Sequence, residues 1–262
     1  MPNRGSIAAL SVAASLTAVS LLATGCGASQ GSSSAKRAPS APTAPASTAA
    51  QVWAPCLTAA QKQSGGVLLD VPASAGQTAE KVSAYVTGTG DAGIVLAHQA
   101  GENLCEWQSG QQELTAAGYR VMAISMVHHD DADVAAAVAE LRKRGVKHVV
   151  LIGASRGGTA VLAGAALISP PVDGVVSLSG PTKSDQGVIA DGVVPNLTTP
   201  LLFAAGTGDE PFFSDAKLMS QSAKPGVATL VQADSSAHGV SLYSSADTIH
   251  QAVLDFVKKH SS

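Results

Sequence analysis

The chain alternates short apolar runs with longer segments of helical periodicity. Eight runs rich in Val, Ile and Leu have the length of β-strands: residues 67–71, 81–87, 93–98, 120–125, 148–152, 174–179, 200–205 and 227–232. Five segments carry helical patterns: residues 102–117, 131–144, 155–167, 214–221 and 245–260. From residue 93 onward, strands and helices therefore alternate, which is typical of an α/β fold with a parallel sheet.

The first strands are connected differently from the later ones. Only short stretches containing Gly or Pro separate the runs 67–71, 81–87 and 93–98, and these stretches leave no room for a helix. We therefore predict antiparallel pairing at this end of an otherwise parallel sheet. Between the runs 174–179 and 200–205 lie only about 20 residues, so we expect helices on both faces of the sheet but no large lid.

Composition excludes two other classes of protein. Of 262 residues, 45% are hydrophobic and 13% are charged, so the chain can bury a substantial core and is not disordered throughout. The formal net charge of -3 leaves no basic surplus to neutralise a phosphate backbone, so we expect no nucleic-acid partner.

Residues 1–25 are typical of an export signal. An apolar segment over residues 7–25 follows Arg4 and ends before Cys26, at the very start of the chain, which indicates a signal peptide rather than a membrane span. The sequence Leu-Ala-Thr-Gly-Cys over residues 22–26 resembles the lipobox of bacterial lipoproteins, so we expect Cys26 to be lipidated. Ordinary secretion, with cleavage near the same place, is the alternative.

The exported chain is expected to have two parts. Residues 26–51 are rich in Ser, Ala and Pro and predict a flexible tether, whereas residues 52–262 form one domain. The remaining cysteines, Cys56 and Cys105, would share an oxidising compartment, and we predict that they form a disulfide. Two separate buried thiols are the alternative.

The pattern Gly-x-Ser-x-Gly occurs twice, and context separates the two matches. Ser29 lies in the predicted tether, whereas Ser155 directly follows the apolar run 148–152 and precedes an Ala-rich helical pattern. A strand, a sharp turn and a helix form a nucleophile elbow, which exposes the serine hydroxyl. A plain tight turn or a phosphate-binding loop is the alternative for residues 153–158.

A serine nucleophile needs a general base and an acid to orient that base. Asp209 follows the apolar run 200–205, and His238 lies in a loop before the last helix. We predict Asp209 as the acid and His238 as the base. Glu210 and Asp215 are alternative acids, although Asp215 also fits the N-cap of the next helix.

Two backbone amides are candidates for an oxyanion hole. The N–H of Arg156 opens the helix after Ser155, and the N–H of Gln99 follows the strand that ends at His98. His98 either organises this loop or is a packed structural residue. We expect the Arg156 side chain to pair with a surface acid rather than with a substrate carboxylate. The segment 128–131, His-His-Asp-Asp, fits a helix start or, alternatively, a metal site.

With these residues in place, the chain resembles the α/β-hydrolases, and within them the dienelactone-hydrolase-like or small serine esterases. The likeness covers about residues 67–260 and includes the elbow, the acid loop, the base loop and the His98-Gln99 pair. It implies an α/β-hydrolase fold. Gln99 stands where the family has Gly, which leaves a backbone N–H available but does not fix its orientation. The chain also carries Ser where dienelactone hydrolases carry Cys, so their lactone substrate is not transferred.

These observations predict a serine hydrolase that cleaves carboxylic esters or related acyl bonds through Ser155, His238 and Asp209. Its substrate would be a small or surface-presented ester, and it would need no metal or organic cofactor. We expect a monomer held at the outer face of the cell membrane through its lipid. A non-catalytic binding lipoprotein of the same fold, and a peptidase or acyltransferase with the same residues, are the alternatives.

Overall fold

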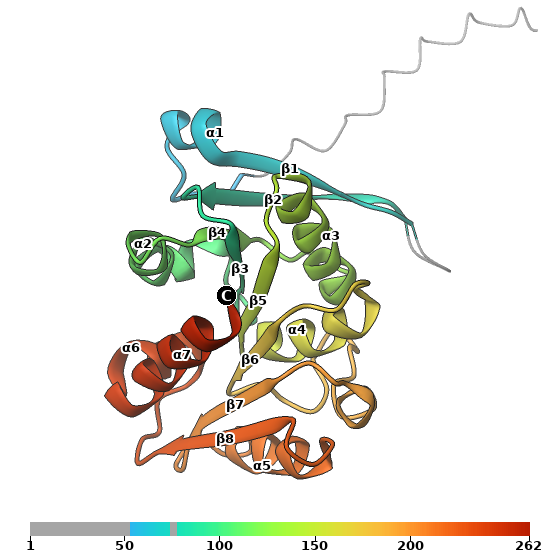
Figure 1. Ribbon diagram of the computed structural model, residues 1–262, viewed down its shortest axis with the longest axis vertical. Coiled ribbons are helices and arrows are strands. Elements are labelled where there is room, and N and C mark those ends of the chain that lie inside the picture. Colours follow the sequence, from blue (N-terminus) through green and yellow to red (C-terminus); the bar gives the residue numbers. More distant parts are fainter. Residues whose placement is uncertain (1–52, 74–77) are drawn as a thin grey trace, which may run out of the picture. The chain divides into compact units, whose positions relative to one another are not determined.

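The computed structural model describes residues 53–73 and 78–262, so the predictions for the signal segment, Cys26 and the tether lie outside the described residues. Its centre is an eight-stranded sheet with the strand order β1-β2-β4-β3-β5-β6-β7-β8 (Figure 1). The strands are β1 (Gly66–Val71), β2 (Glu80–Thr87), β3 (Ala92–Ala97), β4 (Arg120–Ile124), β5 (His148–Ala154), β6 (Gly174–Leu178), β7 (Leu201–Gly206) and β8 (Ala228–Ala233). All eight predicted strands are present, with ends that differ by one or two residues.

The sheet changes from antiparallel to parallel at β4. Strand β2 pairs antiparallel with both β1 and β4, and every pair from β4 to β8 is parallel. This confirms the predicted mixed sheet for β1 and β2. Strand β3, which was also expected at the antiparallel end, instead pairs parallel with β4 and β5. Because parallel strands share a direction, the carboxyl ends of β3, β5, β6, β7 and β8 meet at one edge of the sheet, which is where ligands bind in open α/β sheets.

Helices cover both faces of the sheet (Figure 1). They are α1 (Ala59–Gly65), α2 (Gln108–Ala116), α3 (Asp130–Lys143), α4 (Arg156–Leu167), α5 (Phe212–Ser222), α6 (Gly239–Ser245) and α7 (Asp247–His260), with 3-10 turns η1 (Leu104–Trp107) and η2 (Val194–Asn196). Side chains of α3, α4 and α5 pack in one core cluster, and those of α2, α6 and α7 pack in a second one. Successive residues of β5 alternate between the two clusters, which explains its uninterrupted apolar sequence.

Three helical segments differ from the prediction. Helix α1 was not predicted, because its polar sequence lacks apolar periodicity; it is supported by a capping box between Thr58 and Gln61. The segment 102–117 divides into η1 and α2, and the predicted helix 245–260 is preceded by a separate helix, α6. Ala246 separates α6 from α7 with an extended backbone, φ -111° and ψ 99°.

The predicted disulfide is present. Cys56 and Cys105 are bonded, with their Cα atoms 5.7 Å apart, and so connect the segment before α1 to η1. This confirms the predicted pairing. None of the helices in the described part of the chain is long and apolar enough to cross a membrane.

Candidate active site

Ser155 occupies a strained turn between β5 and α4. Its backbone has φ 49° and ψ -117°, a conformation that non-glycine residues rarely adopt. The flanking glycines are required by contact: a Cβ at Gly153 would lie 2.0 Å from the carbonyl oxygen of Gly157, and one at Gly157 would lie 2.3 Å from that of Ala97. This turn has the strand, bend and helix of a nucleophile elbow.

His238 and Asp209 form a close pair at the carboxyl edge of the sheet. Nδ1 of His238 lies 2.9 and 3.0 Å from the two carboxylate oxygens of Asp209. Asp209 follows β7 and is buried, whereas His238 follows β8 and its side chain is 30% exposed. Because a carboxylate only accepts, Nδ1 carries the proton, which leaves the lone pair of Nε2 available as a base. The ring of Phe212 packs against the imidazole with a centroid distance of 4.3 Å.

The two alternative acids are engaged elsewhere. The carboxylate of Glu210 accepts the N–H of Ser214 at 3.3 Å, and that of Asp215 accepts the N–H of Thr182 at 3.1 Å. Asp215 lies inside the first turn of α5 rather than at its N-cap, so that prediction was wrong: Pro211 takes the cap position, without a side-chain hydrogen bond. Of the three predicted acids, Asp209 is the one that pairs with His238.

The loop that carries His238 packs against the elbow. A Cβ at Gly239 would lie 3.3 Å from Cβ of Ala154, and the N–H of Gly239 donates to Oγ of Ser179 at 3.1 Å. No hydrogen bond joins Ser155 Oγ to His238 within the described residues. Such contacts are often long before a substrate binds. Ser155, His238 and Asp209 thus lie at the same edge of the sheet, but Ser155 and His238 are not hydrogen-bonded to each other in this state.

Of the two predicted oxyanion donors, one is free of helical hydrogen bonding and the other is engaged. Arg156 is the first residue of α4, so its N–H has no acceptor within the helix. The N–H of Gln99, in contrast, donates to Oε2 of Glu106 at 3.0 Å. In this state the Gln99 amide is therefore not available to a substrate. No sequence motif indicated its contact with Glu106.

His98 is packed beneath the same loop. The residue is 1% exposed, and its Nδ1 lies 2.7 Å from the carbonyl oxygen of Gln99, to which it donates. Burial lowers the pKa of His98, so the ring is neutral near pH 7. Both predicted roles apply together: His98 is a packed residue, and it also supports the loop that carries Gln99.

The Arg156 side chain is held by a buried acid rather than the predicted surface acid. Its Nε and Nη2 lie 2.7 and 2.5 Å from the carboxylate oxygens of Asp130, and Nη2 also donates to the carbonyl of Val127 at 3.0 Å. Asp130 is 0% exposed, and the pair raises the pKa of Arg156. The guanidinium is therefore committed to an acid of this chain, although that acid is buried and not on the surface.

The segment 128–131 forms the start of α3. Three acids, Asp130, Asp131 and Asp133, lie in the first turn of that helix, at the positive end of its dipole. His128 instead contacts Glu80, with Nδ1 3.2 Å from the carboxylate. Within residues 53–73 and 78–262, no three His, Cys, Asp or Glu side chains are grouped so as to hold a metal ion.

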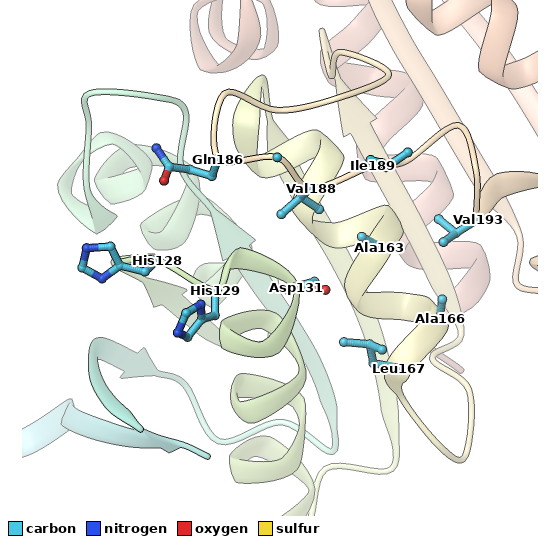
Figure 2. Close-up of a pocket in the computed structure, with 11 residues that line it drawn as sticks. His128, His129, Asp131, Ala163, Ala166, Leu167, Gln186, Val188, Ile189 and Val193 are labelled. Carbon is cyan, nitrogen blue, oxygen red and sulfur yellow. The ribbon is translucent and has the colours of Figure 1, made fainter. Parts of the chain in front are cut away.

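A hollow of about 380 Å³ lies on the other end of α4 (Figure 2). It is lined by the last turns of that helix, by the start of α3 and by the loop after β6: His128, His129, Asp131, Ala163, Ala166, Leu167, Gln186, Gly187, Val188, Ile189 and Val193. Ser155 precedes the first residue of α4, so this hollow is separate from the elbow and does not contain the nucleophile.

Comparisons with known proteins identify the fold. The chain matches no protein-family model and no curated protein sequence. It is similar in structure to an esterase domain from Rhodothermus marinus, with 19% identity, 75% of this chain and 98% of that chain covered, and a TM-score of 0.61. The chain has the α/β-hydrolase fold. This is the fold that the sequence predicted.

Two further structures with this fold are also similar to the chain. An esterase from Rhodococcus is 18% identical, covers 75% of this chain and 99% of its own, and has a TM-score of 0.59. An enol-lactonase from Burkholderia xenovorans is 16% identical, covers 68% and 96%, and has a TM-score of 0.56. At these identities the likeness establishes architecture, and activity must be argued from the site.

Proposed function

We propose that this protein is a serine hydrolase that cleaves carboxylic esters or related acyl bonds. The observation that carries the proposal is the hydrogen-bonded pair of His238 and Asp209 beside the strained turn of Ser155. A plain strand-to-helix turn has no chemical need for an oriented histidine whose Nε2 is free to accept a proton.

The proposed reaction has two steps. His238 Nε2 takes the proton of Ser155 Oγ as that oxygen attacks the acyl carbonyl, and Asp209 stabilises the imidazolium. The Arg156 N–H and the loop of residues 98–101, which contains Gln99, stabilise the oxyanion. His238 then protonates the leaving alcohol, and a water molecule, deprotonated by the same base, releases the acid and restores Ser155. These residues complete the reaction without a cofactor.

The substrate class is inferred from the fold and from the connection above the site. The similar structures named above are described as esterases and an enol-lactonase, which favours an ester over an amide. Between β6 and β7, where a lid would be inserted, the described residues form the short turn η2 and one isolated β-bridge between Lys183 and Ile189. From the absence of a helical lid in this connection we infer an open site, which fits a small or surface-presented ester of a dienelactone-hydrolase-like or small esterase type.

We place the enzyme, as a monomer, at the outer face of the cell membrane, anchored through lipid on Cys26. The Cys56–Cys105 disulfide supports export, because disulfides persist in oxidising compartments. A secreted form without lipid would carry the same disulfide, so mass spectrometry of the mature N-terminus decides between the two. A diacylated Cys26 is the expected result.

The direct test is hydrolysis of short and medium p-nitrophenyl esters by the wild type and Ser155→Ala. We expect turnover by the wild type and its loss in the variant, with both proteins folded by circular dichroism. Ser29→Ala, in the other Gly-x-Ser-x-Gly match, is the control and should keep full activity. A folded wild type that neither turns over esters nor reacts with a fluorophosphonate at Ser155 would point to a binding protein instead.

A further inference from the structure

Gln99 is held from three sides, and one of the holding groups is a carboxylate outside the proposed triad. Its N–H donates to Glu106 Oε2 at 3.0 Å, and its carbonyl accepts from His98 Nδ1 at 2.7 Å. Its side-chain Oε1 accepts the N–H of Val240, two residues beyond His238, at 3.4 Å. Gln99 therefore connects the loop after β3 with the first turn of α6, which directly follows His238.

Glu106 projects from a well-fixed segment. In η1, Cys105 is bonded to Cys56, and the N–H of Cys105 donates to the Asn103 side chain at 3.0 Å. The indole N–H of Trp107 donates to the carbonyl of Ala97 at 3.0 Å, which ties η1 to the end of β3. The carboxylate of Glu106 thus contacts the loop of residues 98–101 from a segment that the disulfide and these hydrogen bonds fix in place.

The charge of Glu106 is costly where it lies. Its Oε1 is buried without a hydrogen-bond partner in the described residues, so the Gln99 amide is the group that compensates for the carboxylate's burial. Burial raises the pKa of Glu106 to about 7, the Gln99 N–H opposes that rise, and the negative charge of Glu102 adds to it. His98, the other titratable group of this loop, is neutral. A partly buried acid with this cost, placed against a loop of the proposed site, is a candidate for a functional role.

We propose that Glu106 is a positioning residue for ester hydrolysis, whose carboxylate fixes the loop of residues 98–101 by accepting the Gln99 N–H. The inference rests on the proposed function, because it concerns the oxyanion amides of that reaction. In this proposal, the N–H of Gln99 anchors the loop. The next two residues, Ala100 and Gly101, are exposed, and no hydrogen bond within the described part of the chain uses their N–H groups, so these amides of the loop are left for a substrate.

The kinetic test compares Glu106→Gln with Glu106→Ala. Glutamine keeps an acceptor oxygen but no charge, so we expect kcat within about threefold of the wild type. Alanine removes the acceptor, and kcat should fall at least about tenfold at nearly constant KM, less than the ~100- to 1,000-fold cost of losing an oxyanion donor. Glu102→Gln, an exposed acid on the same segment, is the matched control and should keep the wild-type kcat at pH 8. Thermal unfolding confirms that each variant is folded.

The pH profile distinguishes positioning from a purely structural role. A carboxylate accepts a hydrogen bond more strongly than a neutral acid, so ionisation of Glu106 should strengthen the anchor as the pH rises through about 7. The ratio of wild-type to Glu106→Gln activity should therefore increase through that range, because the contribution of His238 is common to both. A ratio independent of pH, or a Glu106→Ala variant that is as active as the wild type or more so, would overturn the proposal.

A readout without turnover separates this inference from the proposed function. The amide proton of Gln99, followed by ¹⁵N–¹H NMR, should shift with a midpoint near pH 7 in the wild type and not in Glu106→Gln. If that shift is absent, Glu106 does not anchor the loop, whatever the activity. If it is present but the wild type neither hydrolyses esters nor is labelled at Ser155, the proposed function has failed and the positioning role in hydrolysis fails with it.

Discussion

Arg156 and Asp130 form a two-point ion pair directly behind the elbow, with both guanidinium contacts between 2.5 and 2.7 Å. Asp130 opens α3 and Arg156 opens α4, so the pair joins the first turns of two neighbouring helices. The same residue whose backbone is proposed to bind the oxyanion is thereby held in place through its side chain. One residue would thus serve both the stability of the fold and the proposed reaction.

Removing one partner of this pair should be costly for folding. Arg156→Ala leaves the fully buried carboxylate of Asp130 without its counter-ion, and we expect a loss of about 3 kcal/mol in the free energy of unfolding, measured in urea. The control is Arg144→Ala, which breaks an exposed pair with Glu140 and should cost less than about 1 kcal/mol. Equal losses in the two variants would show that burial is not the cause.

The choice of Asp209 over its neighbours can be tested by amide substitutions. Asp209→Asn would replace an acceptor that fixes the His238 tautomer, and kcat should fall by roughly 1,000- to 10,000-fold. Asp215→Asn keeps an oxygen that can accept the Thr182 N–H, so its kcat should remain within about threefold. Steady-state kinetics on one ester decides the matter, and a larger loss in the Asp215 variant would reassign the acid.

The disulfide should stabilise both the fold and the segment that carries Glu106. The bond connects residues 49 positions apart, and reducing it should lower the free energy of unfolding by about 2–4 kcal/mol. Urea unfolding with and without a thiol reductant measures this difference. The double variant Cys56→Ser and Cys105→Ser should match the reduced wild type and should not respond to the reductant.

The strands of the sheet and the elbow could be predicted from local sequence, but the contacts between segments distant in the sequence could not. The strand residues 149–152 are apolar on both faces because both faces of β5 are buried, and that pattern can be recognised from the sequence alone. Glu106 carries no such signal, because its role depends on a hydrogen bond to Gln99 that only the folded loop creates. The burial of Asp130 could not be predicted either, because acidic residues in the first turn of a helix ordinarily face solvent.

Asp133 should make the stability of this protein depend on pH. The residue is fully buried in the first turn of α3, where its carboxyl accepts the N–H of Val127 at 2.9 Å, and burial raises its pKa to about 8, with Glu80 adding to the rise. Because the folded pKa lies above that of the unfolded chain, the folded state binds more protons between about pH 4 and 8. Stability from this group is therefore lost as the pH rises through that window.

Asparagine at position 133 keeps an oxygen for the Val127 N–H and cannot ionise. We therefore expect Asp133→Asn to gain stability relative to the wild type as the pH rises from 5 to 8, by on the order of 1 kcal/mol or more, measured by urea unfolding at each pH. Asp131→Asn removes a charge from the same turn at a more exposed position and so separates burial from the helix dipole. A difference between Asp133→Asn and the wild type that stays constant over this range would mean that Asp133 is ionised in the folded protein throughout it, against the expectation.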